Sequence, residues 1–172
     1  MGGLPEYLPL LDGWEHLWKT FIPGEIKPIP AGNIFHLVEE KEAGWGWAVT
    51  VISRSNAFWE LRIAVDESTE RHNALVSTPF QAFTYGFTAP NDHIWTPFAA
   101  YVAGLFTLMF CPAEYKPYRK FVDISVRAAD RNPVTGAPIV VPLVIDGALV
   151  VRIKITDEEA FKRSVRELSA PI

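Results

Sequence analysis

The stretch WGWAVTVISRSNAFWELRIAVD, residues 45–66, decides the fold class. Both of its halves alternate large apolar residues with smaller or charged ones, the first as Trp45, Trp47, Val49 and Val51 and the second as Trp59, Leu61, Ile63 and Val65. A period of two residues is typical of a β-strand with one face in a core. The polar turn at 53–56 between the halves predicts an antiparallel hairpin. All three tryptophans share the parity that we expect to point inward.

The same alternation continues on both sides of this stretch. It predicts strands beginning at residue 34 and at 122–128, 139–145 and 149–156, and one or two buried strands within 94–110, broken near Gly104. Pro142 marks 139–145 as an edge strand or a bulge, and Asp146-Gly147 predicts a hairpin turn before 149–156. The charged segment Asp66–Asn73 is predicted to be a connection. Seven to nine strands at such spacings predict a mainly β protein, an antiparallel β-sandwich that is jelly-roll-like.

The two ends of the chain differ from its middle. Residues 1–33 are rich in proline and glycine and form a predicted N-terminal arm, residues 34–156 the β-sandwich domain, and residues 157–172 a C-terminal helix and tail of the same domain. Within the arm, Asp12–Phe21 predicts a short helix capped by Asp12, because its large apolar residues recur at helical spacing. These residues are the candidate assembly interface: Trp14, Leu17, Trp18 and Phe21. Docking on the chain's own domain is the alternative for this segment.

Composition and charge exclude some classes of function. The chain has 172 residues, a net charge of −4 and no run of basic residues, so no nucleic-acid partner is expected. The N-terminus lacks the pattern of a secretory signal, which leaves the cytoplasm as the expected place of synthesis. Cys111 is the one cysteine, in an apolar setting that predicts a buried, inert thiol. Residues 94–113 carry no charge, so membrane association is the alternative to buried strands there.

No group of residues in the sequence has the spacing that catalysis requires. The four histidines, His16, His36, His72 and His93, form none of the local metal-ligand patterns, and no nucleophile elbow or phosphate-binding loop is present. We therefore predict no catalytic residues, no metal ligands and no cofactor. An enzyme whose site is assembled from distant residues is left open.

Three neighbouring residues form a candidate ligand site. Asp92 ends the turn predicted at residues 89–92, His93 follows it, and Trp95 lies two residues further on. The polar pair could orient a ligand that stacks on the indole ring. Sugars stack on exposed aromatic rings, which makes a carbohydrate-binding β-sandwich the first alternative function. A Trp95 that closes one end of the core is the structural alternative.

Residues 31–145 resemble, in order and spacing, the β-sandwich virion proteins of tailed bacteriophages and related viruses. The segments that carry the resemblance are Phe35-His36-Leu37, Gly44-Trp45-Gly46-Trp47, Ile63-Ala64-Val65-Asp66, Tyr85 to Asn91, Pro117-Tyr118-Arg119 and Phe121 to Arg127. Glu67 departs from the pattern, which has a glycine after Val65-Asp66. The resemblance implies a capsid, decoration or tail component without catalytic residues.

The leading hypothesis from the sequence is a non-enzymatic structural protein that self-assembles into a homo-oligomer or larger particle. Its expected partners are other copies of the chain and other virion proteins. Its expected location is the virion, assembled in the host cytoplasm, with a cytoplasmic protein as the alternative.

Overall fold

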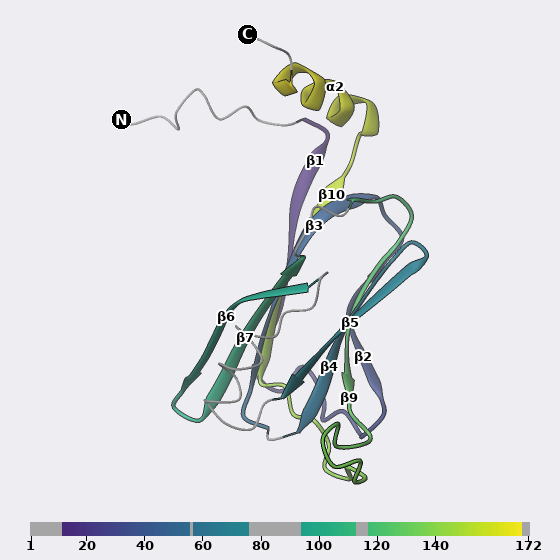
Figure 1. Cartoon of the computed structure of the whole chain (residues 1–172). Coiled ribbons are helices and arrows are strands. Elements are labelled where there is room, and N and C mark those ends of the chain that lie inside the picture. The colour runs from purple at the N-terminus through teal and green to yellow at the C-terminus, as the bar shows by residue number, and fades with distance from the viewer. Residues whose placement is uncertain (1–11, 56, 76–93, 113–116, 170–172) are drawn as a thin grey trace, which may run out of the picture.

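Two antiparallel sheets form the protein in the computed structural model, which describes residues 12–55, 57–75, 94–112 and 117–169. The six-stranded sheet has the order β1-β10-β3-β7-β6, made of Trp14–Phe21, Gly147–Ile155, Gly44–Ser53, Leu105–Pro112 and Ile94–Val102, and the short β8 (Pro117–Tyr118) also pairs with β3. The four-stranded sheet has the order β2-β9-β4-β5, made of Ile34–Glu40, Val122–Ala128, Phe58–Val65 and Ser68–Leu75. Figure 1 shows the two sheets packed as a sandwich.

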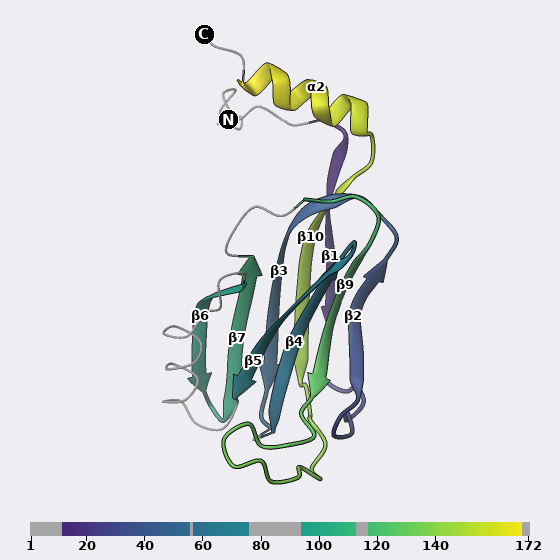
Figure 2. The ribbon, with the colours of Figure 1, turned by 45° about the vertical axis from the view of Figure 1, so that its right-hand side comes forward.

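The chain passes repeatedly from one sheet to the other. β1, β3, β6, β7 and β10 lie in one sheet and β2, β4, β5 and β9 in the other, so the first four strands change sheet at every connection (Figure 2). Such an order of strands over two antiparallel sheets is that of a jelly-roll-like sandwich. The predicted fold class is therefore confirmed.

The core lies between the sheets and consists mainly of the inward-facing side chains of β2, β3, β4, β6, β7, β9 and β10. Trp59 of β4 meets Phe110 of β7 edge to face, with ring centroids 5.6 Å apart. The other fully buried large side chains include Leu37, Leu61, Ile94, Ile124, Leu143 and Tyr118. Trp47 and Trp59 are buried, as predicted. Trp45 is not part of this core, because Gly46 (φ +66°) lies at a bulge that turns Trp45 to the other face of the sheet.

The helix predicted at residues 12–21 is wrong, because Trp14–Phe21 is the strand β1. All eight of its residues pair with β10 in an unbroken antiparallel register, from Trp14 opposite Ile155 to Phe21 opposite Ala148. A helix this short is marginal in isolation, whereas a strand gains a full ladder from β10. Asp12 is not a helix cap; its N–H donates to Ser164 Oγ at 2.9 Å.

Two predicted hairpins are also wrong. β3 and β4, the halves of the 45–66 stretch, lie in different sheets, and β3 pairs with β10 and β7 while β4 pairs with β9 and β5. Alternation reports one buried face and does not distinguish a hairpin from a crossing between two sheets. Asp146-Gly147 is likewise no hairpin turn, since residues 139–145 make only the isolated bridge of Leu143 with Ile29 before β10 begins. Arg54 instead donates to the Asp146 carboxylate from its backbone N–H and its Nε, both at 2.8 Å.

The segment predicted to be a charged connection contains the edge strand β5, which pairs with all of β4. The uncharged segment forms two strands with a break at Gly104, as predicted, over its described residues 94–112. The edge strand β6 is not fully buried, contrary to the prediction, since Phe98 and Val102 are 47% and 71% exposed. The two strands, β6 and β7, are joined at Ala103 and Gly104, whose φ angles are +53° and +80°. Two consecutive positive φ angles are those of the tight turn favoured in hairpins.

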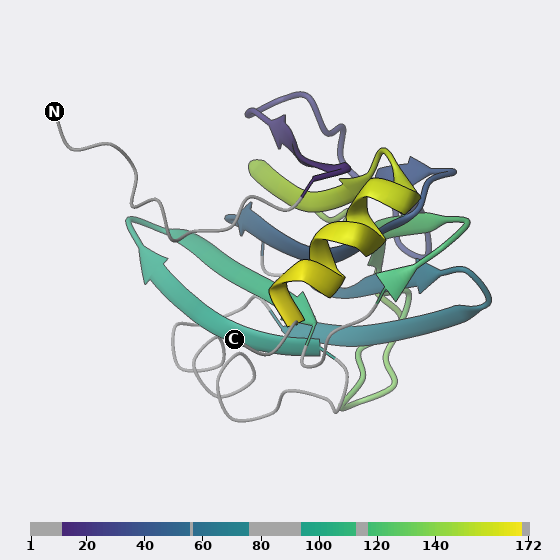
Figure 3. The ribbon, with the colours of Figure 1, turned by 90° about the horizontal axis from the view of Figure 1, so that it is seen from above.

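The helix α2 (Glu158–Ser169) closes the described chain, and Figures 1 and 3 show that it lies across one end of the sandwich. Asp157 caps it, since Asp157 Oδ1 accepts from the N–H of Ala160 at 3.0 Å. Gly13 lies so close to Asp157 and Phe161 that a Cβ would overlap their backbone, which fixes α2 to the start of β1. In the part of the chain that the structure describes, no helix is long and apolar enough to cross a membrane.

Candidate functional site

The residues of the predicted ligand site are only partly described. Asp92 and His93 lie outside the described residues. The backbone of Trp95 lies in β6, opposite Cys111 of β7, whereas the Trp95 side chain is not among the side chains that the structure describes. A ligand site at these three residues therefore stays a prediction.

The four residues of the predicted assembly interface do not share one face. In a strand, side chains alternate between two faces, so Trp14 and Trp18 point to one side of β1 and Leu17 and Phe21 to the other. Phe21 packs on the core edge to face with Phe35, at 5.8 Å between ring centroids. Trp18 is 65% exposed. Helical spacing grouped these residues, but of the four side chains only those of Trp14 and Trp18 lie on the outer face of the sheet.

The face that carries Trp14 and Trp18 is the outer face of the six-stranded sheet. The registers of the ladders identify which residues share it; one row runs across the sheet through Thr20, Leu149, Thr50, Met109 and Phe98. Its neighbours on the same face are His16, Val151, Ile153, Ile155, Ala48, Ile52, Thr107, Ala100, Leu105 and Val102. Among these described residues there is no Lys, Arg, Asp or Glu. We call this set, with Trp14 and Trp18, the uncharged face.

The outer face of the four-stranded sheet has the opposite character. It carries Arg127 and Asp123 of β9, Glu60 and Arg62 of β4, Arg71 of β5, and His36 and Glu39 of β2. His36 Nδ1 lies 2.8 Å from Asp123 Oδ1, and Glu60 contacts Arg71 at 3.4 Å and Arg127 at 3.7 Å. Charges in such a network favour contact with water. Of the two outer faces, only the uncharged face lacks this protection against association.

The strand β10 places its more apolar side outward. Ala148, Val150 and Arg152 point into the sandwich, and Leu149, Val151 and Ile153 point out. Arg152 is accommodated because Glu42 accepts from its Nε at 2.6 Å. From alternation alone, one would place Leu149, Val151 and Ile153 in the core. The alternation of residues 149–156 is therefore the sequence feature that bears on this surface, although it does not show on which side of the sheet these residues lie.

Three aromatic side chains form a row along β1 at the rim of the uncharged face. The His16 ring lies 4.9 Å from the Trp14 ring and 6.4 Å from the Trp18 ring, at interplanar angles of 81° and 69°. Neighbouring rings thus stand nearly perpendicular to one another. A flat platform for sugar stacking needs parallel rings, so this row is better suited to interdigitation with other side chains.

The uncharged face ends at α2. The Trp45 ring, on the outer side of β3, lies 6.4 Å from that of Phe161 in α2. The helix therefore lies at one end of the uncharged face. The rows of residues that contain Trp18 and Met109 lie further along the strands, away from the helix.

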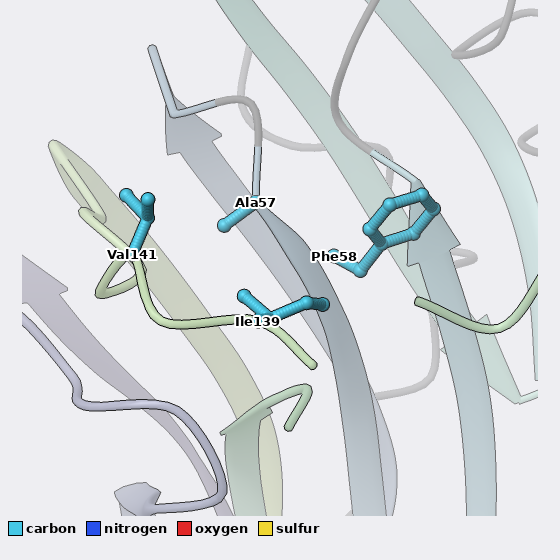
Figure 4. Close-up of a pocket in the computed structure, with 4 residues that line it drawn as sticks. All are labelled: Ala57, Phe58, Ile139 and Val141. Atoms are coloured by element: carbon cyan, nitrogen blue, oxygen red, sulfur yellow. The ribbon is translucent and has the colours of Figure 1, made fainter. Parts of the chain in front are cut away.

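One pocket lies away from this face, between β4 and the segment before β10. Its lining is Ala57 and Phe58 at the start of β4, with Ile139 and Val141 across from them (Figure 4). The volume is about 210 Å³, below the ~300 Å³ at which ligand pockets usually begin. All four lining residues have apolar side chains, so no polar side chain lines the pocket to orient a ligand.

Three buried polar side chains, Glu42, Tyr118 and Arg152, are paired with one another. Tyr118 Oη donates to Glu42 Oε1 at 3.0 Å, and the same carboxylate binds Arg152. Burial raises the pKa of Tyr118, and the charge of Glu42 raises it further. The three side chains close the sandwich near the α2 end and face no pocket that the structure describes.

A second carboxylate organises the turn at the end of β4. Asp66 (φ +51°) accepts from the backbone N–H groups of Arg119, Lys120 and Phe121 at 2.9, 2.7 and 3.1 Å. Burial raises the pKa of Asp66, but these hydrogen bonds and the charge of Lys120 lower it below its ordinary value of 3.8. The turn thus ties the β4–β5 hairpin to the start of β9.

Groups with the composition of a metal site do not occur within the described residues, where no three His, Cys, Asp or Glu side chains gather. Comparison with known proteins adds no assignment. No protein-family model matches the chain, and a search of curated proteins finds no match. The resemblance to virion proteins therefore rests on the sequence segments alone.

Proposed function

We propose that this chain is a non-enzymatic structural protein whose copies assemble through the uncharged face. The carrying observation is the difference between the two outer faces of one sandwich. Ion pairs cover one of them, and the other has no charged side chain in its described part. The cores of protein interfaces are depleted of charge in the same way.

The occupant of the uncharged face is a further copy of the chain. A face without charge is complementary to itself, because a second copy brings no ion that must lose its water. Five strands about 4.8 Å apart and about six residues long give a face on the order of 400 Å². That is the size at which an apolar patch on a monomer is often functional.

A virion component is the finer form of this proposal. Jelly-roll sandwiches are found in viral capsid domains, and also in lectins and cupins, so the fold alone favours none of these. The order of segments between residues 31 and 145 supports the virion. A capsid, decoration or tail protein assembled in the cytoplasm of a host, bound to its own copies and to other virion proteins, fits both lines of support.

A matched pair of variants tests the assembly. Ala48 lies on the uncharged face of β3 and Ala64 on the charged outer face of β4, and both are half-buried. We expect light scattering to show that the wild type and Ala64→Lys associate between about 5 and 200 μM, whereas Ala48→Lys stays monomeric at ~200 μM with an unchanged circular dichroism spectrum. A wild type that is monomeric throughout, or equal association of both variants, would overturn the proposal.

The carbohydrate-binding alternative has one observation in its favour, the exposed ring of Trp18. It predicts that a glycan array detects binding and that Trp18→Ala or Trp95→Ala abolishes it. Absence of binding to every glycan removes this alternative.

A further inference from the structure

The four edge strands of the sandwich are not equally protected against pairing with another chain. β6 has Pro97 within it and a bulge between Trp95 and Phe98. β2 has a bulge between His36 and Val38. A proline or a bulge is a common protection of an edge.

The remaining edges, β5 and β1, are regular over all eight residues. In β5 the neighbouring charges Glu70 and Arg71 lie on opposite faces, so a β5 strand paired with its own copy does not bring them opposite each other. In β1 the charges are Glu15 and Lys19, four residues apart on the same face. Only β1 therefore combines a regular edge with charges that a second copy could match.

The free edge of β1 can be assigned residue by residue. The N–H of Thr156 donates to the carbonyl of Gly13 at 2.8 Å, so Gly13 turns its backbone groups toward β10. Backbone groups alternate in direction along a strand, so Glu15, Leu17 and Lys19 also face β10. The N–H and C=O groups of Trp14, His16, Trp18 and Thr20 consequently point away from the sheet, available to another strand.

We propose that two copies of the chain pair antiparallel along β1, with Leu17 on the two-fold axis. His16 and Trp18 of one copy then exchange backbone hydrogen bonds with Trp18 and His16 of the other. Glu15 comes to lie opposite Lys19 of the second copy, and Lys19 opposite Glu15, in non-hydrogen-bonded positions where side chains are closest. This inference rests on the proposed function and specifies one of its contacts.

Charge selects this register over its neighbours. With His16 on the axis, Glu15 would face Leu17; with Trp18 on the axis, Glu15 would face Phe21. Only the register centred on Leu17 forms two opposite-charge pairs. Among the described residues neither Glu15 nor Lys19 forms an ion pair within its own chain. The Lys19 ammonium lies 5.1 Å from the centroid of the Phe21 ring, a weak cation–π contact that an opposing carboxylate can share.

The pairing also extends the uncharged face. Because directly opposite residues in an antiparallel pair share a face, the Trp14, His16 and Trp18 rows of both copies become neighbours. Burial of one uncharged face against another gives on the order of 800 Å² in total, less than the ~1,200 Å² of most stable interfaces. Edge pairing supplies the additional contact. Two different contacts per copy allow growth beyond a dimer.

Cysteine cross-linking tests the register. In a Cys111→Ser background, Leu17→Cys places two thiols at the closest cross-strand position, and we expect mild oxidation to give a covalent dimer on a non-reducing gel. His16→Cys is the matched control, since residue 16 then lies opposite residue 18 and we expect no dimer. A dimer from His16→Cys with none from Leu17→Cys would overturn this register.

Charge exchange tests the two ion pairs. Glu15→Lys and Lys19→Glu each replace two attractive pairs with two repulsive ones, so we expect the dissociation constant of the dimer to rise roughly tenfold or more. The double variant Glu15→Lys/Lys19→Glu restores opposite charges, and its dissociation constant should return to within a few-fold of the wild type. Sedimentation velocity measures all four proteins.

The outcomes separate this inference from the proposed function. Association that Ala48→Lys abolishes but that the single charge variants leave unchanged would reject β1 pairing and leave the proposed function standing. A wild type that stays monomeric and forms no Leu17→Cys dimer would reject both. Loss in each single variant without recovery in the double variant would also reject the paired charges.

Discussion

Arg152 Nε lies 2.6 Å from Glu42 Oε1 between the two sheets, where the Arg152 side chain is 9% exposed and that of Glu42 4%. This ion pair is what lets β10 turn its smaller and charged side inward. The apolar residues Leu149, Val151 and Ile153 then lie on the outer face. The surface that we assign to assembly thus depends on a buried pair on the opposite side of the same strand.

Replacement of Glu42 by glutamine should therefore destabilise the protein strongly. It leaves the Arg152 guanidinium buried without a counter-charge, and the loss of one partner of a buried pair costs about 3–5 kcal/mol. Chemical denaturation monitored by tryptophan fluorescence measures this as a fall in the free energy of unfolding.

Tyr118→Phe is the graded control for the same cluster. It removes one hydrogen bond to Glu42 and keeps the ion pair, so we expect a loss of about 1 kcal/mol. Equal losses in Glu42→Gln and Tyr118→Phe would show that the charge of Glu42 contributes nothing.

Asp66→Asn should remove a pH-dependent part of the stability. The folded pKa of Asp66 is lowered, so its ionised form favours folding above the unfolded pKa of about 3.9. That contribution is lost as the pH falls through the lower, folded pKa. Asparagine tolerates the positive φ of residue 66, so the variant changes the charge and not the backbone requirement.

Thermal unfolding between pH 2 and 7 measures this effect. The wild type should be the more stable protein at pH 6, and the two curves should converge toward pH 2. A constant difference in melting temperature at every pH would contradict a role for the carboxylate charge.

Trp18→Ala and Phe21→Ala should have different effects, because the two side chains lie on opposite faces of the strand β1. Phe21 packs on the core, so its truncation should lower the free energy of unfolding by about 2–4 kcal/mol. Trp18 is mostly exposed, so its truncation should change stability by less than about 0.5 kcal/mol and weaken association. Chemical denaturation measures the stability of both variants, and light scattering measures their association. Equal losses of stability in the two variants would contradict the strand assignment of residues 14–21, which places Trp18 and Phe21 on opposite faces.

The sequence predicted the sandwich because alternation survives in β3, β4 and β9, where one face meets the core. It could not predict which strands pair, since the same alternation in β3 and β4 suits a hairpin or a change of sheet. It misassigned β1 because Trp14, Leu17, Trp18 and Phe21 match helical spacing, and the pairing with β10 that overrides this spacing lies more than a hundred residues away. The uncharged face could not be predicted from the sequence either, because it consists of residues from five strands whose pairing the sequence does not show.

Cys111 of β7 lies on the same outer side of the sheet, beside the uncharged face, which makes its thiol a reporter of assembly. Burial raises its pKa above the ordinary value of 9.0, and the thiolate is the reactive form. At low protein concentration we therefore expect reaction with an aromatic disulfide to have a midpoint above pH 9, which returns to the ordinary value when denaturant unfolds the chain. A folded midpoint at or below 9.0 would contradict the burial of this thiol.

The same reaction should slow as the protein concentration rises, because copies that stack on the uncharged face shield the sulfur atom. In Ala48→Lys the rate should be independent of concentration, and in Ala64→Lys it should follow the wild type. Stopped-flow absorbance at a fixed pH near 8.5 follows all three proteins over the concentrations used for light scattering. If the wild type associates in scattering while its thiol reacts at a constant rate, the contact lies away from the Cys111 end of the face, and pairing along β1 alone would account for the association.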